Sequence, residues 1–496
     1  MARPETIASQ PLSFHDLRAW LERIEDIGQL ERMSKLHWNL EMGAFAEIIL
    51  ERFKSPPALL FEDIPDDQRN SRMLVHMLET IERAAFALNM SPDLKPIPFI
   101  DALREKLRNL QPLQAQRVTS GPIFERQEEG NDVDLLKFPV PRWHEGDGGR
   151  YLGTGHLVIT RDPETGDENI GCYRVMVHDK NRLTLYISPG KHGRIHREKT
   201  LDAGKPFPVA MVFGQHPLMF IAATQSVPIG VNEYEWAGGI VGEPVQLIEG
   251  PLTGLRIPAA AEIAIEGEII PGETLPEGPF GEWTGYYASA RRAEPVVNVK
   301  AVYHRQDPII TGAPPFKPTI HGSYRSLLRG AMIWNAMEQA GVPDIRGVYL
   351  PPPAQRFMIV VAIKQRYPGH AKQAAIVAGQ CQPGAYLGRY VVVVDDDVDV
   401  TNLDEVVWAM ATRSDPASSL DIIRRAWSGP LDPILPTERK GHNSRAIIDA
   451  TRPYEWRDRF PAISQINDEK RREVTARWEK EILRIESQHQ KATRGL

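Results

Sequence analysis

The apolar run Val209-Ala-Met-Val-Phe213 has the length of a β-strand, and the region Gly121–Gln306 around it repeats this pattern. Similar runs occur at Leu157-Val-Ile-Thr160, Arg182–Ile187 and Val296–Val302, with glycines and prolines between them. Because glycine and proline mark turns, each run is bounded as a strand would be. Short strands at regular spacing predict a β-barrel or a β-sandwich in the middle of the chain.

The residues before this region alternate between helical and strand patterns. Ser13-Phe-His-Asp16 has the pattern of a helix N-cap, and apolar residues follow it at helical spacing. We expect further helices at Leu40–Phe53 and Met77–Leu88 and a short strand at Ala58–Phe61. An N-terminal α/β module that ends near Leu113 accounts for all of these elements.

The residues after the central region show the same alternation. Ser323–Met337 has helical periodicity. Strands are expected at Phe357–Ile363 and Tyr390–Val394, and helices at Ala371–Gly379 and Leu403–Arg413. Strands that alternate with helices predict an α/β unit.

The last stretch, Asp468–Ser487, is charged and amphipathic and has no core of its own, so we expect it to pack on a partner subunit. The chain is therefore predicted to have a multidomain fold of the α+β and α/β classes. The expected parts are an N-terminal α/β domain (1–113), a central β domain (114–322), a linker helix (323–345), a C-terminal α/β domain (346–465) and a terminal helix (466–496).

Charge and composition exclude several classes of function. A formal net charge of -6, from 59 basic and 65 acidic residues, gives no reason to expect a nucleic acid or an anionic membrane as a partner. No window approaches the ~18 apolar residues of a membrane span, and Met1–Pro11 lacks a secretory signal, so a cytoplasmic protein is expected. The two cysteines, Cys172 and Cys381, are too few for a disulfide framework or a thiolate zinc site.

Two carboxylates bracket the segment Glu277-Gly-Pro-Phe-Gly-Glu282. Its glycines and proline disfavour regular structure, so we expect both acids on a tight loop. A basic neighbour can drive the pKa values of two close carboxyl groups apart, so that one stays ionised and the other carries a proton near neutral pH. The pair is therefore either a general acid–base site or two solvated turn acids.

A second candidate segment is Asn169-Ile-Gly-Cys-Tyr-Arg174. Strand alternation would place Cys172 and Arg174 on one face, and Gly171 permits a close backbone approach. A buried arginine needs an anion, which one of the two glutamates or a substrate carboxylate would supply. The alternative is an arginine whose tip lies in water.

Asn169, His192 and Glu233 offer two oxygens and one imidazole near bends of the chain. This set suits manganese or magnesium that also takes phosphate oxygens from a cofactor, although the spacing forms no metal motif and each residue is also common as a structural residue. The glycine-rich fingerprints of dinucleotide and nucleotide sites are absent from the sequence, as is a nucleophile elbow. An enzyme built on this chain would need an unusual cofactor.

Several motifs spread over the chain occur together in one order. They are Asn169–Arg174, Glu277–Tyr286, Tyr367-Pro-Gly-His-Ala-Lys372, Val394-Asp-Asp-Asp-Val398 and Val407-Trp-Ala-Met-Ala-Thr-Arg413. Together they resemble the UbiD family of decarboxylases. The likeness covers nearly the whole chain, and a set of motifs in the family's order is far more specific than any one of them.

The resemblance implies a prenylated flavin mononucleotide (prenylated FMN) in a central split β-barrel domain, with its phosphate held by Mn²⁺ or Mg²⁺ and with K⁺ as a further ion. It implies a UbiX-type flavin prenyltransferase as the cofactor's supplier, and a homodimer or a hexamer assembled through the C-terminal α/β domain. By matching position the implied metal ligands are Asn169, His192 and Glu233. The implied cofactor-binding residues are Asn169, Ile170, Arg174, Lys191, His192, Thr224, Gln225 and Glu233.

The resemblance also implies the reaction: reversible decarboxylation of an aromatic or heteroaromatic carboxylic acid, with CO2 as the other small molecule. Loss of CO2 from an sp2 carbon leaves a carbanion that water does not stabilise, so an electron sink is required. Arg174, Glu277 and Glu282 match the family's catalytic Glu–Arg–Glu network, with Glu282 as the expected proton donor. The expected substrate-lining residues are Phe316, Lys317, Thr319, Ile320, His321 and Met410.

Three questions stay open from the sequence. Lys317 and His321 either meet a second polar or anionic group of the substrate or are exposed loop cations. Gly369-His-Ala-Lys372 and Ile448-Asp-Ala-Thr451 look closest to polyprenyl hydroxybenzoate decarboxylases of quinone synthesis, although Arg445 stands where that branch tends to carry lysine. Two alternatives come from other functional classes. One is a flavin-dependent oxidoreductase or a non-catalytic flavin carrier built on a split barrel, and the other is a scaffold protein.

Overall fold

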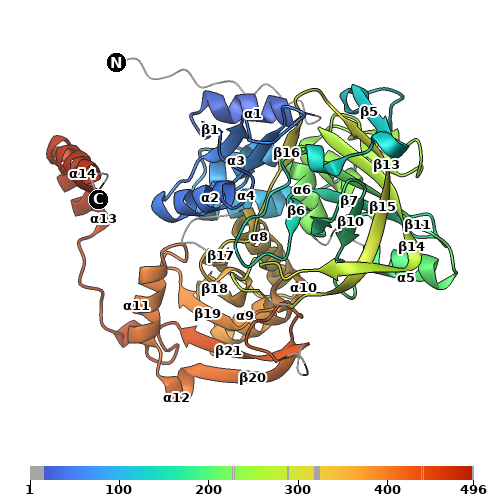
Figure 1. Cartoon of the computed structure of the whole chain (residues 1–496). Coiled ribbons are helices and arrows are strands. Elements are labelled where there is room, and N and C mark those ends of the chain that lie inside the picture. The colour runs from blue at the N-terminus through green and yellow to red at the C-terminus, as the bar shows by residue number, and fades with distance from the viewer. Residues whose placement is uncertain are drawn as a thin grey trace. The chain divides into compact units, whose positions relative to one another are not determined.

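The computed structural model describes residues 16–225, 227, 230–287, 290–317, 324–436, 438 and 441–493 (Figure 1). The chain divides into two compact units, Met1–Thr451 and Arg452–Leu496. None of the described helices combines the length and the hydropathy that crossing a bilayer requires.

A four-stranded sheet, in the order β1-β2-β3-β16, forms the N-terminal part. Its strands are β1 (Leu30–Ser34), β2 (Ala58–Glu62), β3 (Arg72–Val75) and β16 (Ile309–Thr311). The helices of this part are α1 (Leu17–Asp26), α2 (Glu41–Arg52), α3 (Ile81–Ala87) and α4 (Pro96–Arg108). The sequence did not predict β16, which returns from beyond the central region and pairs in parallel with β3.

Helix α1 begins one turn later than the sequence pattern suggested. Asp16 is its N-cap, and its carboxylate accepts a hydrogen bond from the Arg18 N–H at 2.8 Å. The predicted cap, Ser13, lies outside the described residues. The apolar face is as expected, because Leu17, Trp20, Leu21 and Ile24 are all buried.

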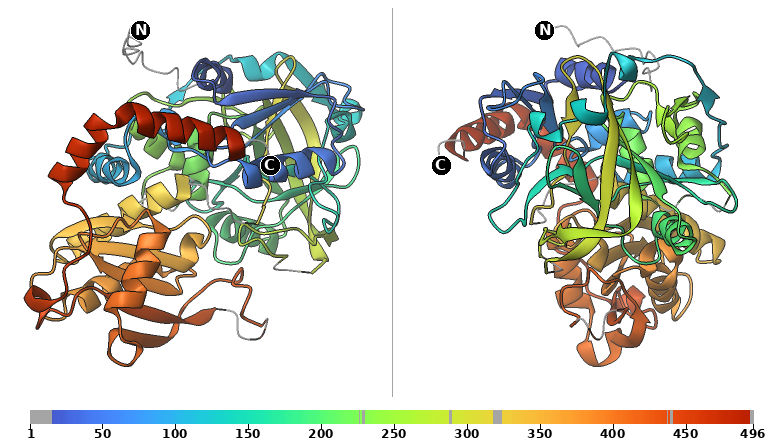
Figure 2. Two further views of the ribbon diagram at one scale, coloured as in Figure 1. Left: turned by 90° about the vertical axis from the view of Figure 1, so that its left-hand side faces the viewer. Right: turned by 45° about the vertical axis from the view of Figure 1, so that its right-hand side comes forward.

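A nine-stranded antiparallel sheet forms the centre and confirms the predicted β-rich region. Its order is β6-β9-β10-β15-β14-β11-β7-β8, with β5 on β15. The long antiparallel pair β14 and β15 runs through this part of the molecule (Figure 2). The strands are β5 (Arg126–Glu129), β6 (Arg150–Gly153), β7 (Leu157–Arg161), β8 (Glu168–Gly171), β9 (Val175–Val177), β10 (Arg182–Leu185), β11 (Phe207–Phe213), β14 (Ile263–Glu277) and β15 (Arg292–His304).

Smaller elements complete the centre. A three-stranded sheet has the order β13-β12-β4. Its strands are β4 (Gln116–Arg117), β12 (Gln246–Glu249) and β13 (Arg256–Pro258). The helices are α5 (His192–Asp202), α6 (Pro217–Thr224) and α7 (Glu233–Val241).

The C-terminal sheet has the order β17-β18-β19-β21-β20, and its three inner strands are parallel. This confirms the predicted alternation of strands and helices. The strands are β17 (Ile345–Tyr349), β18 (Met358–Ile363), β19 (Tyr390–Asp395), β20 (Leu420–Trp427) and β21 (His442–Ala450). The helices are α8 (Tyr324–Gln339), α9 (His370–Gln380), α10 (Gln382–Ala385), α11 (Leu403–Arg413) and α12 (Pro416–Ser419).

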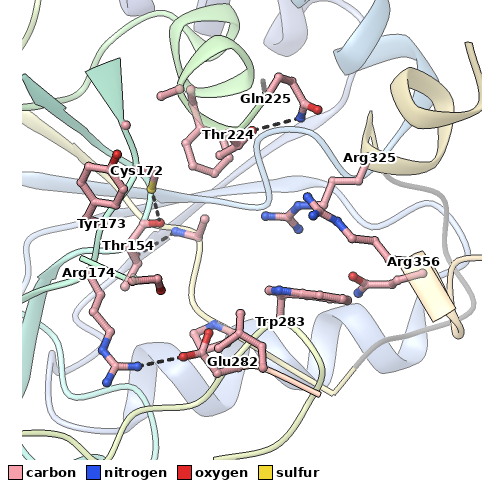
Figure 3. Close-up of a pocket in the computed structure, with 18 of the residues that line it drawn as sticks. Thr154, Cys172, Tyr173, Arg174, Thr224, Gln225, Glu282, Trp283, Arg325 and Arg356 are labelled. Carbon is pink, nitrogen blue, oxygen red and sulfur yellow. Dashed lines mark hydrogen bonds and ion pairs between the residues drawn. The ribbon is translucent and has the colours of Figure 1, made fainter. Parts of the chain in front are cut away.

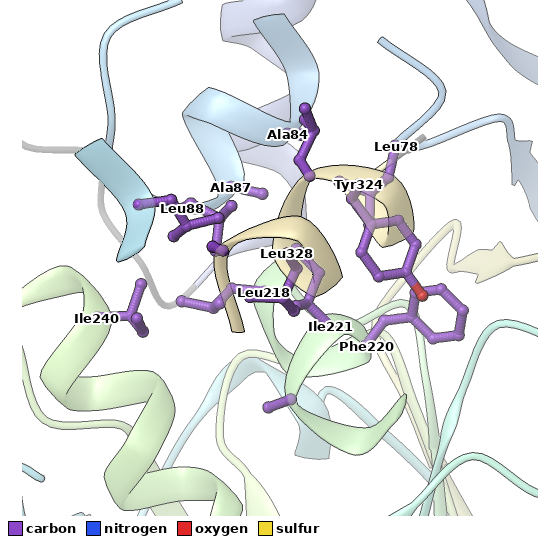
Figure 4. Packing of buried hydrophobic residues seen from close by; sticks show 14 of the residues in the cluster. Leu78, Ala84, Ala87, Leu88, Leu218, Phe220, Ile221, Ile240, Tyr324 and Leu328 are labelled. Carbon is purple, nitrogen blue, oxygen red and sulfur yellow. The ribbon is translucent and has the colours of Figure 1, made fainter. Parts of the chain in front are cut away.

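The three parts of Met1–Thr451 share one hydrophobic core. Leu88 follows α3, Leu218 lies on α6 and Leu328 lies on α8, and all three side chains are buried in the same cluster (Figure 4). Burial of one such side chain stabilises the fold by roughly 1.5–3 kcal/mol. The core therefore fixes α6 and α8, two helices whose ends carry site residues.

The unit Arg452–Leu496 contains two helices, α13 (Asp468–Arg477) and α14 (Glu479–Thr493). The single amphipathic helix expected at Asp468–Ser487 is therefore divided. The backbone leaves helical geometry at Trp478, where φ is −115° and ψ is 21°. No residue of α13 is buried.

Candidate active site

A cavity of about 790 Å³ is lined by residues from all three parts of Met1–Thr451 (Figure 3). His76 reaches it from the N-terminal part, Arg174 from the central sheet, and Arg329 and Leu431 from the C-terminal part. Its volume lies within the range of ~300–1,000 Å³ that is typical of small-molecule sites.

Most of the residues singled out in the sequence meet at this cavity. Eleven of them line it: Asn169, Ile170, Arg174, Lys191, His192, Thr224, Gln225, Glu233, Glu282, Phe316 and Lys317. Glu277 lies behind Arg174 and is fully buried. Thr319, Ile320 and His321 lie outside the described residues.

Met410 does not line the cavity. It lies on α11, a helix that packs on β19 and β21, and its side chain is half-buried against the hydrophobic core. The sequence motif at Val407–Arg413 instead ends in Arg413, whose guanidinium pairs with Asp395 at 3.1 Å and with Asp397 at 2.8 Å. The motif therefore holds α11 to the end of β19.

Glu277, Arg174 and Glu282 form one ion-paired cluster, here called the Glu–Arg–Glu cluster. Arg174 donates from Nε and Nη2 to the two oxygens of Glu277, each at 2.8 Å, and from Nη1 to Glu282 at 2.9 Å. Burial alone would lower the pKa of Arg174, but the bonds and charges of Glu277 and then Glu282 outweigh it, so its pKa is raised. The guanidinium is therefore a permanent cation at pH 7.

The backbone around this cluster is fixed by close packing. Glu277 is the last residue of β14 rather than a loop residue, and Gly278 follows it at φ +83°, a conformation that favours glycine. Phe280 stacks on Tyr151 with ring centroids 3.9 Å apart, and the Tyr151 hydroxyl donates to Glu277 at 3.1 Å. Glu282 then opens a tight turn, which presents its carboxyl group to the cavity.

Cys172 and Arg174 do not share a strand face as the sequence pattern suggested. Strand β8 ends at Gly171 and β9 begins at Val175, so both residues lie in the irregular segment between the two strands. The Tyr173 ring folds back over Gly171, where a Cβ would lie 2.3 Å from the ring. Both side chains nevertheless reach the cavity. Burial raises the pKa of Cys172 to about 11, so this thiol stays protonated.

The predicted metal ligands come from three elements that meet at one side of the cavity. Asn169 lies on β8, His192 is the first residue of α5, and Glu233 is the first residue of α7. Glu233 accepts a hydrogen bond from the Ile170 N–H at 3.2 Å, and burial raises the pKa of Glu233 to about 7. Within the described ranges, no group of three or more His, Cys, Asp or Glu residues is placed to hold a metal ion.

Thr224 and Gln225 line the cavity at the end of α6. The Thr224 hydroxyl shares a hydrogen bond of 3.1 Å with the Tyr324 hydroxyl, which joins α6 to α8. The Gln225 side chain donates to Thr224 at 3.3 Å, and its amide oxygen is buried with no hydrogen-bond partner in the part of the chain that the structure describes. This oxygen is a candidate acceptor for a bound ligand.

Sequence reasoning missed three arginines of the cavity, Arg325, Arg329 and Arg356, here called the arginine cluster. Arg325 and Arg329 are four residues apart at the start of α8, so they point to the same side of the helix. That spacing was visible within the predicted helix Ser323–Met337, and two arginines on one face were a usable signal. Arg356 lies after β17, and no pattern in the sequence connects it with them.

The C-terminal part closes the cavity with Tyr386 and the segment Trp427–Leu431. Two buried side chains hold these residues. The Asp432 carboxylate accepts from Ser428 at 3.0 Å and pairs with Arg389. Arg445 donates to the backbone carbonyls of Ala385 and Trp427. Arg445 thus fixes the backbone beside Tyr386 and beside the segment 427–431.

Comparison with known proteins agrees with this architecture. Profiles of the 3-octaprenyl-4-hydroxybenzoate carboxy-lyase N-terminal domain, Rift-related domain and C-terminal domain match residues 21–102, 116–318 and 324–450. The pyrrole-2-carboxylic acid decarboxylase of Pseudomonas aeruginosa is 32% identical over 90% of this chain and 93% of its own. The phenolic acid decarboxylase of Bacillus subtilis is 31% identical over 89% and 93%.

A solved structure is similar along nearly the whole chain. The UbiD-class enzyme HmfF from Pelotomaculum thermopropionicum, in complex with FMN, superposes with a TM-score of 0.81 at 30% identity and covers 92% of this chain and 98% of its own. An evolved dimeric form of HmfF in complex with prFMN gives a TM-score of 0.77 at 29% identity, with the same coverage.

Fold and site together define a multidomain α+β enzyme whose cavity is shared by three regions of the chain and holds a buried Glu–Arg–Glu cluster. The predicted fold class is confirmed by the solved structures. The chain belongs to the UbiD family of carboxy-lyases.

Proposed function

We propose that this carboxy-lyase reversibly decarboxylates an aromatic or heteroaromatic carboxylic acid with prenylated FMN as its cofactor, and that Glu282 is the proton donor. The observation that carries the proposal is the Glu–Arg–Glu cluster at the cavity wall. Arg174 is fully engaged by Glu277 on its buried side, and Glu282 lies between Arg174 and the cavity.

The cluster separates two roles for its carboxyl groups. Glu277 has no exposed surface and accepts two hydrogen bonds from Arg174. Glu282 takes one bond from Arg174, and its side chain retains 15% exposure. Glu282 is therefore better placed than Glu277 to exchange a proton with a substrate carbon and with solvent. The charge of Arg174 also favours a carboxylate nearby, because fixed cations stabilise anions in a site that excludes water.

The residues present fit a bound flavin. The cavity volume exceeds the need of a small acid alone, and the buried Gln225 amide oxygen and the Lys191 ammonium offer one acceptor and one cation on its lining. A prenylated flavin, when bound, supplies the electron sink that loss of CO2 from an sp2 carbon requires. The protein's part is to orient the acid against Arg174, to exclude water, and to deliver the proton from Glu282.

We also propose Asn169, His192 and Glu233 as ligands of Mn²⁺ or Mg²⁺, with K⁺ as a second ion. Amide oxygen, imidazole and carboxylate suit a hard divalent ion. Three protein ligands do not complete the coordination shell of such an ion. A cofactor phosphate would supply the further oxygens. Burial raises the pKa of Glu233 to about 7, and a cation beside this carboxylate would favour its ionised form.

Two partners complete the proposal. A UbiX-type flavin prenyltransferase would supply the cofactor, as membership of the UbiD family implies. A homo-oligomer, a dimer or a hexamer, is supported by apolar side chains that α13 and α14 expose. Val474, Leu483 and Ile485 retain 40%, 57% and 47% exposure. Exposed apolar side chains grouped on short helices are typical of subunit contacts.

The arginine cluster and Lys191 argue against the alternative that this chain is a polyprenyl hydroxybenzoate decarboxylase of quinone synthesis. A polyprenyl chain needs a long apolar wall, and a wall that carries four cationic side chains disfavours it because burial of unpaired charge is costly. We therefore place the substrate among small polar aromatic acids.

The test is to produce the protein together with a flavin prenyltransferase, identify the released cofactor by mass and by its ultraviolet–visible spectrum, and measure CO2 release from a panel of aryl and heteroaryl acids. We expect prenylated FMN, CO2 release from at least one acid, and exchange of solvent deuterium into the product carbon. Mature holoenzyme that exchanges neither labelled bicarbonate nor deuterium into any acid would contradict the proposal.

A further inference from the structure

The turn that carries Glu282 is closed by two hydrogen bonds of its own backbone. The Glu282 N–H donates to the Tyr286 carbonyl at 2.9 Å, and the Gly285 N–H donates to the Glu282 carbonyl at 2.8 Å. This turn presents the Glu282 carboxyl group to the cavity, where it accepts a hydrogen bond from Arg174 (Figure 3). The position of the carboxyl group therefore depends on what holds the turn at its two ends.

Both ends of the segment around Glu282 are held by two adjacent residues, Asp147 and Gly148. At the first end, the Gly148 N–H donates to the Pro279 carbonyl at 2.8 Å. At the second end, the Tyr287 hydroxyl donates to the Asp147 carboxylate at 3.2 Å. Because Glu282 lies between these contacts in the sequence, the two neighbouring residues clamp its turn from both sides.

Asp147 is itself held firmly by the backbone. It is 4% exposed, and its Oδ2 accepts hydrogen bonds from the backbone N–H groups of Trp143 at 3.2 Å and His144 at 2.9 Å. Its other oxygen, Oδ1, accepts the bond from Tyr287. Burial, and then the charge of Asp147, raises the pKa of Tyr287 to about 12, so this hydroxyl keeps its proton at pH 7 and acts as the donor. The carboxylate thus connects a fixed backbone to the end of the turn.

Packing supports the same connection. A Cβ at Gly146 would lie 2.7 Å from the Tyr287 hydroxyl oxygen, so the tyrosine lies directly against the backbone before Asp147. The ring of His144 meets the ring of Phe316 edge-on, with centroids 5.5 Å apart, and Phe316 lines the cavity. The segment that supports the turn of the proposed proton donor therefore also supports a second part of the cavity wall.

We propose that Asp147 is a positioning residue, whose bond to Tyr287 fixes Glu282 where it delivers its proton. The inference rests on the proposed function, in which Glu282 returns a proton to the ring carbon. Asp147 is not among the described residues that line the cavity, so it acts through Tyr287 and the turn. Reactions depend steeply on the placement of the reacting groups, and a shift of about 1 Å slows them by up to about 100-fold.

Two isotope exchanges separate the placement of Glu282 from a general loss of structure. Exchange of labelled bicarbonate into the acid breaks and re-forms one carbon–carbon bond and needs no proton on that carbon. Exchange of solvent deuterium into the product breaks and re-forms the carbon–hydrogen bond, for which Glu282 carries the hydrogen. Both are measured on flavin-loaded enzyme, with the acid of the panel that releases CO2 fastest and with its decarboxylated product.

Tyr287→Phe removes only the hydroxyl that bonds Asp147. We expect it to slow deuterium exchange about tenfold and to change bicarbonate exchange less than about twofold, because one hydrogen bond that holds the donor is lost. The control Tyr390→Phe removes a hydroxyl from β19 at nearly the same exposure, 47% against 46% for Tyr287, and should leave both exchanges unchanged.

Two variants of Asp147 sharpen the result. Asp147→Ala should slow deuterium exchange at least as much as Tyr287→Phe does. Asp147→Asn should restore deuterium exchange to within about threefold of the wild type, because the amide oxygen accepts from the backbone and the amide NH2 group donates to the Tyr287 oxygen. If Asp147→Ala fails to fold, Tyr287→Phe carries the test alone.

Amide hydrogen exchange of the flavin-free protein measures the turn itself without turnover. The amides of Glu282 and Gly285 are bonded within the turn. They should exchange about fivefold or more faster in Tyr287→Phe and in Asp147→Ala than in the wild type, because the turn opens more readily when one end is released.

Three outcomes would overturn the inference: deuterium exchange that stays at the wild-type rate in Tyr287→Phe, equal slowing of the two isotope exchanges in this variant, or unchanged amide exchange of the turn. Wild-type holoenzyme that shows neither isotope exchange would instead contradict the proposed function. The amide measurement on the flavin-free protein would then decide by itself whether Asp147 holds the turn.

Discussion

The two sides of the cavity use the same residue type in opposite ways. Arg174 is satisfied by the protein, with three bonds of 2.8–2.9 Å to Glu277 and Glu282. Arg329 and Arg356 have no carboxylate partner in the described ranges. The first arrangement holds the proposed catalytic groups in place through bonds within the protein, whereas no carboxylate of the described residues pairs with Arg329 or Arg356.

This difference separates stability from function. Removal of one partner from a buried ion pair leaves an uncompensated charge and destabilises the fold, whereas removal of an unpaired buried cation relieves a cost. Substitutions in the two clusters should therefore move stability in opposite directions, although both reduce function. The predictions below run from the largest expected effect to the smallest.

The largest effect is expected at Glu282. Glu282→Gln keeps the hydrogen bond to Arg174 but removes the transferable proton, so CO2 release should fall by about 10²- to 10⁴-fold. Flavin content should be unchanged. The matched control Glu51→Gln, an exposed position of α2, should retain wild-type turnover. Near-normal turnover in Glu282→Gln would remove this residue from the mechanism.

Glu277→Gln tests the ion-paired Glu–Arg–Glu cluster. Glu277 is fully buried and takes two bonds from Arg174, so loss of its charge should lower the free energy of unfolding by about 3 kcal/mol. Urea unfolding of the flavin-free protein measures this quantity. A variant as stable as the wild type would show that the pair does not hold the cluster.

Gly148→Ala should disturb the same side through the backbone. A Cβ at this position would lie 1.9 Å from the Gly278 carbonyl oxygen, and backbone cannot move aside cheaply. Overpacking of this kind costs about 1–3 kcal/mol. We expect lower stability and lower turnover together, because the displaced segment carries Glu282. Unchanged kcat with lower stability would show that the segment moves without its carboxyl group.

Arg356→Leu tests the arginine cluster, which has no carboxylate partner among the described residues. The substitution removes a cation that burial and neighbouring arginines disfavour, so the flavin-free protein should become more stable by about 1 kcal/mol. Urea unfolding of the flavin-free protein measures this difference. Destabilisation of similar size would remove the contrast between the two clusters.

Asp162 and Lys199 form a more solvated counterpart of the Arg174–Glu277 pair, at 2.9 Å. The hydrogen bond from Lys199 lowers the pKa of Asp162 to about 2. A depressed carboxyl pKa contributes stability above the unfolded value of ~3.9 and loses it as the pH falls toward 2. Asp162→Asn should therefore be slightly less stable than the wild type at pH 7, and the difference should vanish between pH 4 and pH 2. A difference that persists at pH 2 would exclude this ionisation as its cause.

Much of the architecture followed from periodicity. The strands Leu157–Arg161 and Phe207–Phe213 and the helix α11 lie within about two residues of their predicted bounds, because apolar runs and turn residues are local signals. The pairing of β16 with β3 was not predictable in this way, since it joins segments more than 200 residues apart and depends on the assembled core. The irregular backbone at Cys172–Arg174 was missed because Tyr173 packs on Gly171, a tertiary contact.

In the candidate site, too, the features with a local sequence signal were predicted and those that depend on tertiary contacts were missed. Motifs in family order brought Asn169, Arg174 and Glu282 to one cavity, where the structure also places them. The arginine cluster was missed because no single motif contains it. Arg325 and Arg329 were detectable as a helical pair, but Arg356 joins them only through the fold.

The division of the cavity wall among the three parts of the chain has a consequence for how the enzyme matures. His76 contributes to the wall early in the sequence and Leu431 late in it, with Arg174 between them. A ribosome must release almost the entire polypeptide before the wall exists, so we expect the proposed cofactor to bind only after synthesis is nearly complete. If the proposed cofactor binds the folded protein in this way, a cell that makes the protein faster than the cofactor would accumulate folded protein without cofactor.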